Sequence, residues 1–473
     1  MESRLDLVPY TEEIPADLET PVSAYLKLQP LGARFLLESV ERGEAVGRYS
    51  FLGASCRDSF VVHRDRARWR VRGENGEKEL GGEDPLRTLS SILARFRLRP
   101  APGLPPLAGG AVGHVSYDYV RYLERIPRRL PDPLDLPLAS FYLVDELVVF
   151  DHVRRKILLV ALAPEGDPSG RERLAEIRSR LAGPTPRPGA VARPLAGPFE
   201  SSTSRESFEA SVRKAQEHIR AGDIFQVVLS RRLSAPARVS PFAVYRSLRI
   251  ENPSPYMFFL DFDDYQLVGS SPEALVTLST DLAVTRPIAG TRPRGATPEE
   301  DARLAAELLA DPKERAEHLM LVDLARNDLG RVCRYGSIQV APYYAVERYS
   351  HVMHIVSGVS GRLAEGHDAF DLFRATFPAG TVSGAPKVRA MELIEDLETI
   401  ARGPYAGAVG YFGLSGEMDT AIAIRTVLFE GGRAHLQAGA GIVHDSDPAR
   451  EFEETANKMR ALEVAIEKTV ELA

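Results

Sequence analysis

Cysteine is nearly absent from this chain, which has only Cys56 and Cys333 among 473 residues. Two thiols cannot form the disulfide framework of a small secreted domain, so burial has to hold the fold together. We interpret both cysteines as small buried hydrophobic residues, because neither lies in a sequence context that would activate a thiol. Lysine is also scarce, since it accounts for 8 of the 59 basic residues.

Long apolar runs are missing as well. No segment approaches the ~20 apolar residues that cross a bilayer, and residues 2–30 mix charged residues with proline instead of forming the apolar region of a signal peptide. We therefore expect a cytoplasmic protein without a membrane partner. The formal net charge is -7 and the pI is about 5.9, which gives no reason to expect nucleic acid as a partner.

What the chain does have is the composition of a large globular protein, with 44% hydrophobic and 26% charged residues. Residues 183–198 (GPTPRPGAVARPLAGP) are rich in proline and glycine and indicate a linker. We predict an N-terminal domain over residues 1–185 and a second domain over residues 200–473. Strand-like segments, hairpins and long helices occur together, which favours the α+β class.

Local signals predict several elements. Asp84-Pro85 opens a helix that runs to about Arg97. A capping box at Thr203 and Glu206 opens another helix. Residues 421–429 alternate as one strand, with Arg425 on the apolar face. A buried arginine needs a partner, which is either a ligand carboxylate or a structural acid.

Two acidic stretches far apart share one design: residues 311–317 (DPKERAE) and residues 447–454 (DPAREFEE). Asp is a favoured helix N-cap, and Pro fits the first helical position because its missing N–H would be unpaired there. Each stretch then places two glutamates three residues apart, on one helix face. The four are Glu314, Glu317, Glu451 and Glu454. If the helices meet in one cavity, these carboxylates form a site that suits Mg²⁺; alone, either stretch is typical of a solvated helix face.

Small residues follow a turn at residues 430–432, in the segment 437–441 (QAGAG). They let a ligand approach the backbone, whose N–H groups can hold an anion, although a tight turn packed on a helix explains them equally. Residues 380–387 (GTVSGAPK) lack the Gly-Lys-Ser/Thr of a phosphate loop, which excludes a P-loop NTPase. His351 and His354 lie in a strand-like segment and are either core residues or acid–base groups. No histidine pair has the spacing of a zinc site.

Nine segments together resemble the chorismate-utilising enzymes, most closely the anthranilate synthase component I branch. They are residues 35–39 (FLLES), 47–51 (GRYSF), 222–226 (GDIFQ), 252–257 (NPSPYM), 271–273 (SPE), 287–292 (PIAGTR), 318–331 (HLMLVDLARNDLGR), 380–389 (GTVSGAPKVR) and 437–458. The resemblance covers nearly the whole chain. It implies a large two-domain β-sandwich with helices packed outside, which binds chorismate with Mg²⁺.

The resemblance also implies roles for individual residues. The metal ligands are Glu317 and Glu454, with Glu314 and Glu451 as their neighbours. The substrate contacts are Gly290, Thr291, Tyr405, Arg425, Gly439, Ala440 and Gly441. Glu273 is the general acid for the departing C4 hydroxyl, His354 serves the later loss of pyruvate, and Thr381 lines the same cavity. Glu38, Ser39, Pro255, Tyr256 and Met257 form a tryptophan site to which the N-terminal domain contributes.

Two positions distinguish the branches of the family. Members that add water at C2 use a lysine as base where this chain has Gln226, which cannot deprotonate water. Aminodeoxychorismate synthases have a lysine where this chain has Ala289. Both differences favour addition of ammonia at C2, giving anthranilate and pyruvate. The resemblance of the Glu38 and Pro255 segments to a tryptophan site implies feedback inhibition by tryptophan. Component I of an aminodeoxychorismate synthase, or a tryptophan-binding regulator without activity, are the alternatives.

The nitrogen source has no candidate in this chain, because neither cysteine lies in the Gly-x-Cys-x-Gly sequence of a glutaminase. We therefore expect a separate glutamine amidotransferase subunit, component II, in a hetero-oligomer. Ammonia from that subunit would have to travel through a channel, because ammonia released into water at neutral pH becomes protonated to ammonium.

Overall fold

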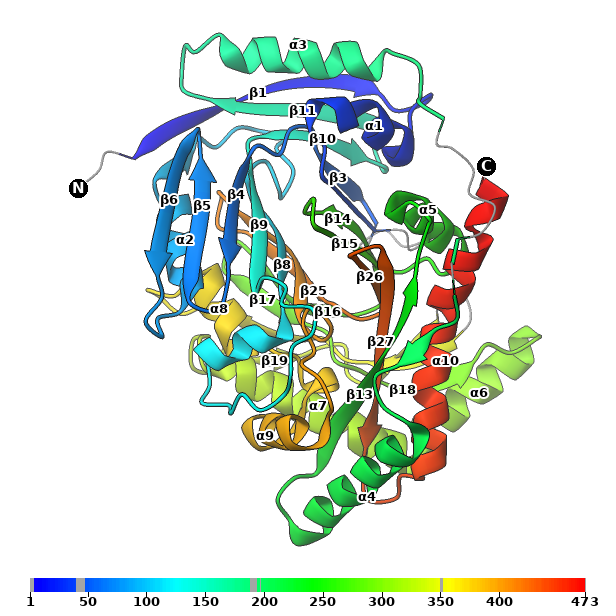
Figure 1. The fold of residues 1–473 in the computed structure, drawn as a ribbon. Coiled ribbons are helices and arrows are strands. Elements are labelled where there is room, and N and C mark those ends of the chain that lie inside the picture. The colour runs from blue at the N-terminus through cyan, green and yellow to red at the C-terminus, as the bar shows by residue number, and fades with distance from the viewer. Residues whose placement is uncertain (1–3, 40–46, 188–193, 196, 349–351, 473) are drawn as a thin grey trace.

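The computed structural model describes residues 4–39, 47–187, 194–195, 197–348 and 352–472. Two large sheets face each other, and helices lie against their outer sides (Figure 1). This arrangement confirms the α+β sandwich with helices outside.

The larger sheet has thirteen strands within the described residues, and only β1 and β7 pair in parallel among its strands. Its order is β12 (Glu200–Ser201), β13 (Gln226–Pro236), β27 (Arg433–Ile442), β26 (Thr426–Glu430), β15 (Tyr265–Ser271), β14 (Tyr256–Asp261), β2 (Phe35–Glu38), β3 (Tyr49–Gly53), β10 (Glu146–Asp151), β11 (Lys156–Ala163), β1 (Leu5–Pro15) and β7 (Phe96–Leu98), with β23 (Gly384–Ala385) paired to β13.

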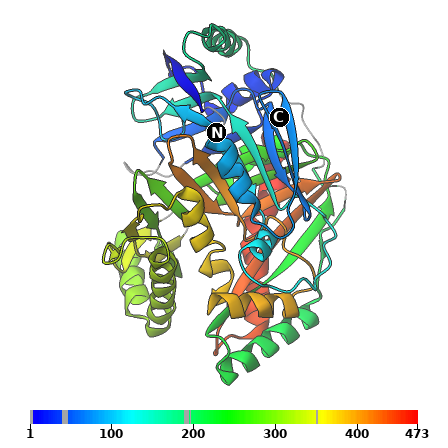
Figure 2. The ribbon, with the colours of Figure 1, turned by 90° about the vertical axis from the view of Figure 1, so that its left-hand side faces the viewer.

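The second sheet is antiparallel and has eleven strands in the part of the chain described. Its order is β19 (Gln339–Val340), β22 (Val359–Arg362), β17 (Leu282–Thr285), β16 (Ala274–Ser279), β25 (Met418–Ile422), β24 (Ala408–Gly413), β8 (Gly110–Val115), β9 (Ala139–Val144), β4 (Asp58–Val62), β5 (Arg66–Val71) and β6 (Glu74–Glu79). A small sheet of β18 (Ile288–Pro293), β21 (Val352–Val356) and β20 (Ala345–Arg348) belongs to a lobe on one side (Figure 2).

Strands from both sides of the proline- and glycine-rich segment enter each large sheet. In the larger sheet β2 pairs with β14, and in the second sheet β8 pairs with β24. Of that segment, residues 188–193 and 196 lie outside the described residues. The boundary between two domains at residues 185–200 therefore stays a prediction. In the structure, both large sheets contain strands from before and from after this boundary.

A hydrophobic core fills the space between the two sheets. Phe35, Phe258 and Leu428 of the larger sheet belong to the same buried cluster as Val112 and Val409 of the second. Polar contacts also cross it: the Tyr142 hydroxyl donates to the Asp261 carbonyl over 2.5 Å. Strand β10 is buried at every position, which explains its unbroken apolar run.

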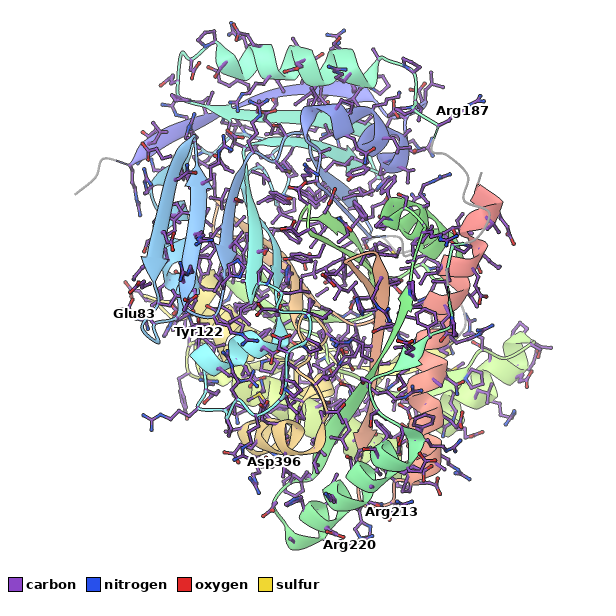
Figure 3. The ribbon with its side chains drawn as sticks, viewed as in Figure 1. Glu83, Tyr122, Arg187, Arg213, Arg220 and Asp396 are labelled. Atoms are coloured by element: carbon purple, nitrogen blue, oxygen red, sulfur yellow. The ribbon has the colours of Figure 1, made fainter. Side chains whose placement is uncertain are left out.

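The described residues contain ten α-helices: α1 (Pro21–Leu28), α2 (Pro85–Leu93), α3 (Ser169–Leu181), α4 (Arg205–Ala221), α5 (Pro241–Glu251), α6 (Pro298–Ala310), α7 (Pro312–Gly330), α8 (Ala369–Thr376), α9 (Lys387–Leu397) and α10 (Pro448–Glu467). Helix α6 packs on the small sheet and on α7 instead of on a large sheet. Helix α4 buries Val212 and Ala215, while Arg213 and Arg220 lie on its outer side (Figure 3). No described helix is long and apolar enough to cross a membrane.

Three local predictions were wrong. The helix that Asp84 caps ends at Leu93, because the chain then turns into β7 and pairs with β1. The cap of α4 is Ser204, whose hydroxyl accepts from the Ser207 amide, so the capping box at Thr203 does not form. Residues 421–429 are two strands, because the chain leaves the second sheet after β25 and joins the larger sheet at β26.

Candidate functional site

Both acidic stretches begin helices, as predicted. The Asp311 carboxylate accepts from the amides of Lys313 (2.9 Å) and Glu314 (3.3 Å) at the start of α7. The Asp447 carboxylate accepts from the Arg450 amide over 2.9 Å at the start of α10. Because each N-cap fixes where its helix begins, it also fixes the face on which the two following glutamates lie.

A cavity of about 570 Å³ brings together residues that are far apart in the sequence. The predicted site residues that line it are Gln226, Glu273, Gly290, Thr291, Glu314, Glu317, His354, Thr381, Tyr405, Arg425, Gly439, Gly441, Glu451 and Glu454. Ala440 differs, because its side chain points to the other face of β27 and is fully buried in the core. His351 lies outside the described residues.

The four glutamates of α7 and α10 share this cavity. Burial, together with the charge of Glu314, raises the pKa of Glu317, and burial raises the pKa of Glu451. Glu314 pairs with Arg292 over 3.0 Å, and Glu454 pairs with Lys458 over 2.6 Å.

No three His, Cys, Asp or Glu side chains among the described residues are close enough together to hold a metal ion as they stand. The donor set nevertheless fits Mg²⁺, which takes carboxylate oxygens and keeps several waters. Besides burial, the charge of Glu314 raises the pKa of Glu317, and a cation beside the two carboxylates would relieve this repulsion.

Glu273 is the most strongly perturbed acid in the cavity. Glu273 is 9% exposed. Burial raises the pKa of its carboxyl to about 8, although the Thr381 hydroxyl and the charge of Lys458 lower it. A carboxyl with this pKa holds its proton at neutral pH. It can therefore act as a general acid there.

His354 is held by the neighbouring strand. Its Nδ1 lies 3.0 Å from the Gly290 carbonyl oxygen, which can only accept, so the proton is on Nδ1. The Thr291 hydroxyl lies 3.1 Å from the same nitrogen. Burial lowers the pKa of His354 and keeps the ring neutral. This geometry leaves Nε2 as the basic nitrogen.

Arg425 occupies the corner where the chain passes from one large sheet to the other. Its φ of 50° is left-handed, a conformation that non-glycine residues adopt rarely. Its Nη1 donates to the Lys458 carbonyl over 2.7 Å, and burial lowers its pKa. A ligand carboxylate is a suitable further partner for the guanidinium.

Small residues make room beside Arg425. A Cβ at Gly439 would lie 2.9 Å from the Tyr405 hydroxyl oxygen, and one at Gly441 would lie 2.5 Å from the Gln226 amide nitrogen. Burial raises the pKa of Tyr405 to about 12, so its hydroxyl remains a donor. Gln226 and Ala289 both line the cavity.

Lys458 is a site residue that the sequence analysis missed. Its Nζ donates to the Gly439 carbonyl over 2.9 Å and pairs with Glu454 one helical turn earlier. The spacing of four residues from Glu454 was the available signal, because it places both side chains on the same face of α10.

The residues predicted for the tryptophan site lie elsewhere, at the ends of β2 and β14. Met257 pairs with Glu38 across these strands. The Glu38 carboxylate accepts from the Tyr245 hydroxyl over 2.5 Å and from Arg249 over 3.2 Å. Pro255 is buried beside them. Within the described residues, the buried Ser39 hydroxyl has no hydrogen-bond partner.

Tyr256 is separated from the rest of this group. Neighbouring residues of a strand face opposite sides, so its side chain lies on the other face from Met257. There it approaches Asp419 of the second sheet, and burial together with the charge of Asp419 raises the pKa of Tyr256 well above its usual range.

Comparison with known proteins shows the family of the chain. The profile of a family described as chorismate binding enzyme matches residues 49–463. The chain belongs to this family of chorismate-binding enzymes. Anthranilate synthase component 1 from Thermus thermophilus is 51% identical over 466 residues, which is 97% of this chain and 98% of that protein. The protein of the same name from Pseudomonas aeruginosa is 47% identical over 468 residues, covering 96% and 94%.

Solved structures of chorismate-binding enzymes share the fold. Anthranilate synthase component I from Streptococcus pneumoniae superimposes with a TM-score of 0.79 at 38% identity, over 95% of this chain and 99% of that one. The menaquinone-specific isochorismate synthase from Escherichia coli superimposes with a TM-score of 0.74 at 20% identity, over 98% and 96%, which shows a common fold only.

Proposed function

We propose that this chain is the large subunit of an anthranilate synthase, which converts chorismate and ammonia to anthranilate and pyruvate. The observation that carries the proposal is the cavity itself. It combines a protonated acid (Glu273), a neutral histidine (His354), a carboxylate clamp (Arg425 and Tyr405) and four glutamates. The identity of 47–51% to proteins named anthranilate synthase component 1 supports it over nearly the whole chain.

The chemistry follows from where these groups lie. Arg425 and Tyr405 hold a carboxylate of chorismate, while the Gly439 and Gly441 positions leave room for it. Glu273 gives its proton to the C4 hydroxyl as that group leaves and nitrogen adds at C2. His354 Nε2 then takes the proton from C2 as the C3–O bond breaks, so that the ring becomes aromatic and the enolpyruvate leaves and takes up a proton to give pyruvate.

Glu317 and Glu454 would hold Mg²⁺, with Glu314 and Glu451 beside them. The bound cation would neutralise a carboxylate of the substrate and orient the ring. Lys458 pairs with Glu454 over 2.6 Å and so holds this carboxylate from the same helix face.

The side chains at two positions favour ammonia as the nucleophile and C2 as the site of addition. Gln226 cannot serve as the base that water would need. Ala289 offers no amine at the position where aminodeoxychorismate synthases have a lysine. Neutral ammonia needs no base, so this cavity suits it without further residues.

Nitrogen delivery gives a direct test of the proposal. We expect the purified chain with chorismate and Mg²⁺ to form anthranilate from ammonia at alkaline pH, and to form none from glutamine until a glutamine amidotransferase subunit is added. The physical reason is that only the unprotonated amine is a nucleophile, and this chain has no glutaminase nucleophile. The measurement is the increase in anthranilate fluorescence. If this chain alone forms anthranilate from glutamine, the prediction of a partner subunit is wrong. If chorismate is consumed and no anthranilate appears, the predicted product is wrong.

Tryptophan is the inhibitor that we propose for the second site, at Glu38, Ser39, Pro255 and Met257. Tyr256 can contribute only its backbone, because its side chain faces the other side of β14. The Glu38 carboxylate can accept from the ammonium of an amino acid, and the buried Ser39 hydroxyl can donate to its carboxylate. A ligand bound there could shift the catalytic cavity through the shared larger sheet, provided that it prefers one of two conformations.

Ser39→Ala should raise the tryptophan concentration needed for half-inhibition by about tenfold, the equivalent of one lost hydrogen bond. The uninhibited rate should not change, because Ser39 does not line the catalytic cavity. Ser55→Ala is the matched control, since the Ser55 hydroxyl is also buried without a partner among the described residues. Equal sensitivity of both variants and the unmodified chain to tryptophan would remove Ser39 from the site.

A further inference from the structure

A buried ion pair lies directly behind the wall of the catalytic cavity. The side chains of Arg402 and Glu398 are 1% and 3% exposed, and neither residue lines the cavity. Two nitrogens of the guanidinium face the carboxylate, Nη2 at 2.6 Å from Oε1 and Nε at 3.1 Å from Oε2. Removing two charges from water is costly, so apolar residues in the place of a buried ion pair often give a protein that is equally stable. Its position next to the cavity therefore needs another explanation.

The remaining donors of Arg402 reach two segments of the cavity wall. Nη1 donates to the Val382 carbonyl over 2.7 Å, and Nη2 donates to the Val228 carbonyl over 2.7 Å. Val382 follows Thr381 in the short 3-10 turn Gly380–Val382. Val228 lies two residues after Gln226 on β13. Both valines line the cavity themselves.

The guanidinium also packs against aromatic rings. Its central carbon lies 4.6 Å from the ring centre of Tyr117 and 5.7 Å from that of Tyr405. Contacts of this kind between a cation and a ring are attractive, and more so when they are desolvated. Tyr405 contacts the substrate in the proposed function. Arg402 therefore packs against the side of its ring that lies away from the cavity.

Through Glu398 the network also reaches β27, in addition to the turn at Val382, strand β13 and the Tyr405 ring. Its Oε1 accepts from the Ser230 amide over 2.8 Å and from the Ser230 hydroxyl over 2.9 Å. The Ser230 hydroxyl in turn accepts from the Gln437 side-chain amide over 2.9 Å. Gln437 belongs to β27 and lines the cavity. One ion pair therefore contacts, directly or through Ser230, four elements of the substrate pocket.

We infer that Arg402, oriented by Glu398, is the positioning residue of the chorismate pocket, and this inference rests on the proposed function. It fixes the turn that carries Thr381, the strand that carries Gln226, and the ring of Tyr405 relative to one another. Only a planar guanidinium has the number and direction of N–H donors for this task. A lysine ammonium at the same place cannot reach both carbonyls and both carboxylate oxygens together.

Arg402→Lys tests the inference against a matched control. Arg173 on α3 makes similar contacts far from the cavity: its Nη1 lies 2.9 Å from Asp145 and 3.2 Å from Glu146, and its Nη2 donates to the Leu162 carbonyl over 2.5 Å. With ammonia and Mg²⁺, below the unfolding temperature of each protein, Arg402→Lys should lower kcat/KM for chorismate about 10²-fold, the typical effect of a misplaced substrate. Arg173→Lys should change it by no more than about twofold while lowering Tm.

The division of the effect between kcat and KM separates positioning from stability. We expect KM for chorismate to rise and kcat to fall in Arg402→Lys, because the Tyr405 ring and the pocket wall are displaced. Loss of folded protein alone would lower the apparent kcat and leave KM and the pH profile unchanged. Wild-type kcat/KM in Arg402→Lys, or an equal loss in Arg173→Lys, would overturn the inference.

A second variant covers failure to fold. If Arg402→Lys is insoluble, Glu398→Gln keeps the size and the acceptor oxygen but removes the charge that orients the guanidinium. It should show the same loss of kcat/KM, and a wild-type value would overturn the inference. If the unmodified chain makes no anthranilate, the proposed function fails instead. Chorismate affinity measured by calorimetry then decides: weaker binding in Arg402→Lys than in Arg173→Lys supports the positioning role, and equal binding overturns it.

Discussion

Replacing Glu273 by Gln should lower anthranilate formation by about 10²- to 10⁴-fold, the usual contribution of a general acid. Glutamine fills the same space and keeps an oxygen acceptor, but it has no acidic proton for the leaving hydroxyl. Chorismate affinity should stay close to that of the unmodified chain, because Arg425 and Tyr405 are unchanged. The measurement is kcat/KM with ammonia and, separately, chorismate affinity by calorimetry. Full activity in Glu273→Gln would remove Glu273 from the acid role.

The pH dependence should change in the same variant. Burial raises the pKa of Glu273 to about 8, so the unmodified chain loses its acid as the pH rises through that value. When rates are compared at equal concentrations of unprotonated ammonia, kcat/KM should fall about tenfold per pH unit above this pKa. Glu273→Gln should show no such decline.

The unfolding free energy should also depend on pH through Glu273. The folded state holds the Glu273 proton up to a pH of about 8, whereas an exposed carboxyl releases it near its usual value of 4.5. Between these values the unfolded state binds fewer protons, so the unfolding free energy decreases as the pH rises, by at most about 1.4 kcal/mol per pH unit. Glu273→Gln should flatten this slope. Glu146 is also buried with a raised pKa, so Glu146→Gln should flatten the slope as well. Because Glu146 lies on β10 outside the cavity, this variant should leave the pH dependence of kcat/KM unchanged, which separates the catalytic effect from the stability effect.

Replacing Glu454 by Ala should raise the Mg²⁺ concentration needed for half-maximal activity by about 10- to 100-fold or more, since even the neighbours of metal ligands have effects of that size. At saturating chorismate and low Mg²⁺ the rate should fall at least as far. The physical reason is the loss of an oxygen ligand from a set of four carboxylates. Direct titration with Mg²⁺ by calorimetry measures the same affinity without turnover.

The adjacent residue supplies the control for Glu454. Glu453 lies on the same helix but outside the cavity, where its carboxylate accepts from Arg205 over 3.0 Å. Glu453→Ala removes an equal charge and should leave the Mg²⁺ dependence unchanged. If the two variants behave alike, the effect comes from net charge and the metal assignment is wrong. Retention of full Mg²⁺-dependent turnover in Glu454→Ala would also refute it.

Some features of this protein depend only on short stretches of sequence. Asp311-Pro312 and Asp447-Pro448 begin α7 and α10 because an N-cap and a first-turn proline act on the nearest amides. The pairing of glutamates on one helix face follows from the helical repeat. The turn at residues 430–432 likewise joins β26 to β27, as expected from its two glycines.

Other predictions failed because contacts distant in sequence overrode a local pattern. The alternation in residues 421–429 favours one strand, yet the chain changes sheets at Arg425. The alternation continues across the break although its residues face different clusters. Ala423 lies in the core between the sheets, whereas Val427 and Phe429 pack under the helices outside the larger sheet, so only the tertiary packing reveals the break. Helix α2 ends early for a similar reason: pairing of β7 with β1 decides where Phe96 lies.

The sequence by itself determined the helix starts, the acid pairs and the family motifs, because each depends on residues close together in the chain or on a resemblance spread along it. Only the tertiary structure decided that the two acid pairs meet in one cavity, that Lys458 reaches Gly439, and that Arg402 lies behind the pocket wall. It also decided the raised pKa of Glu273, since burial depends on every element that surrounds the carboxyl. Side-chain chemistry is a property of residue type, whereas proximity and desolvation exist only after strands and helices from both halves have packed together.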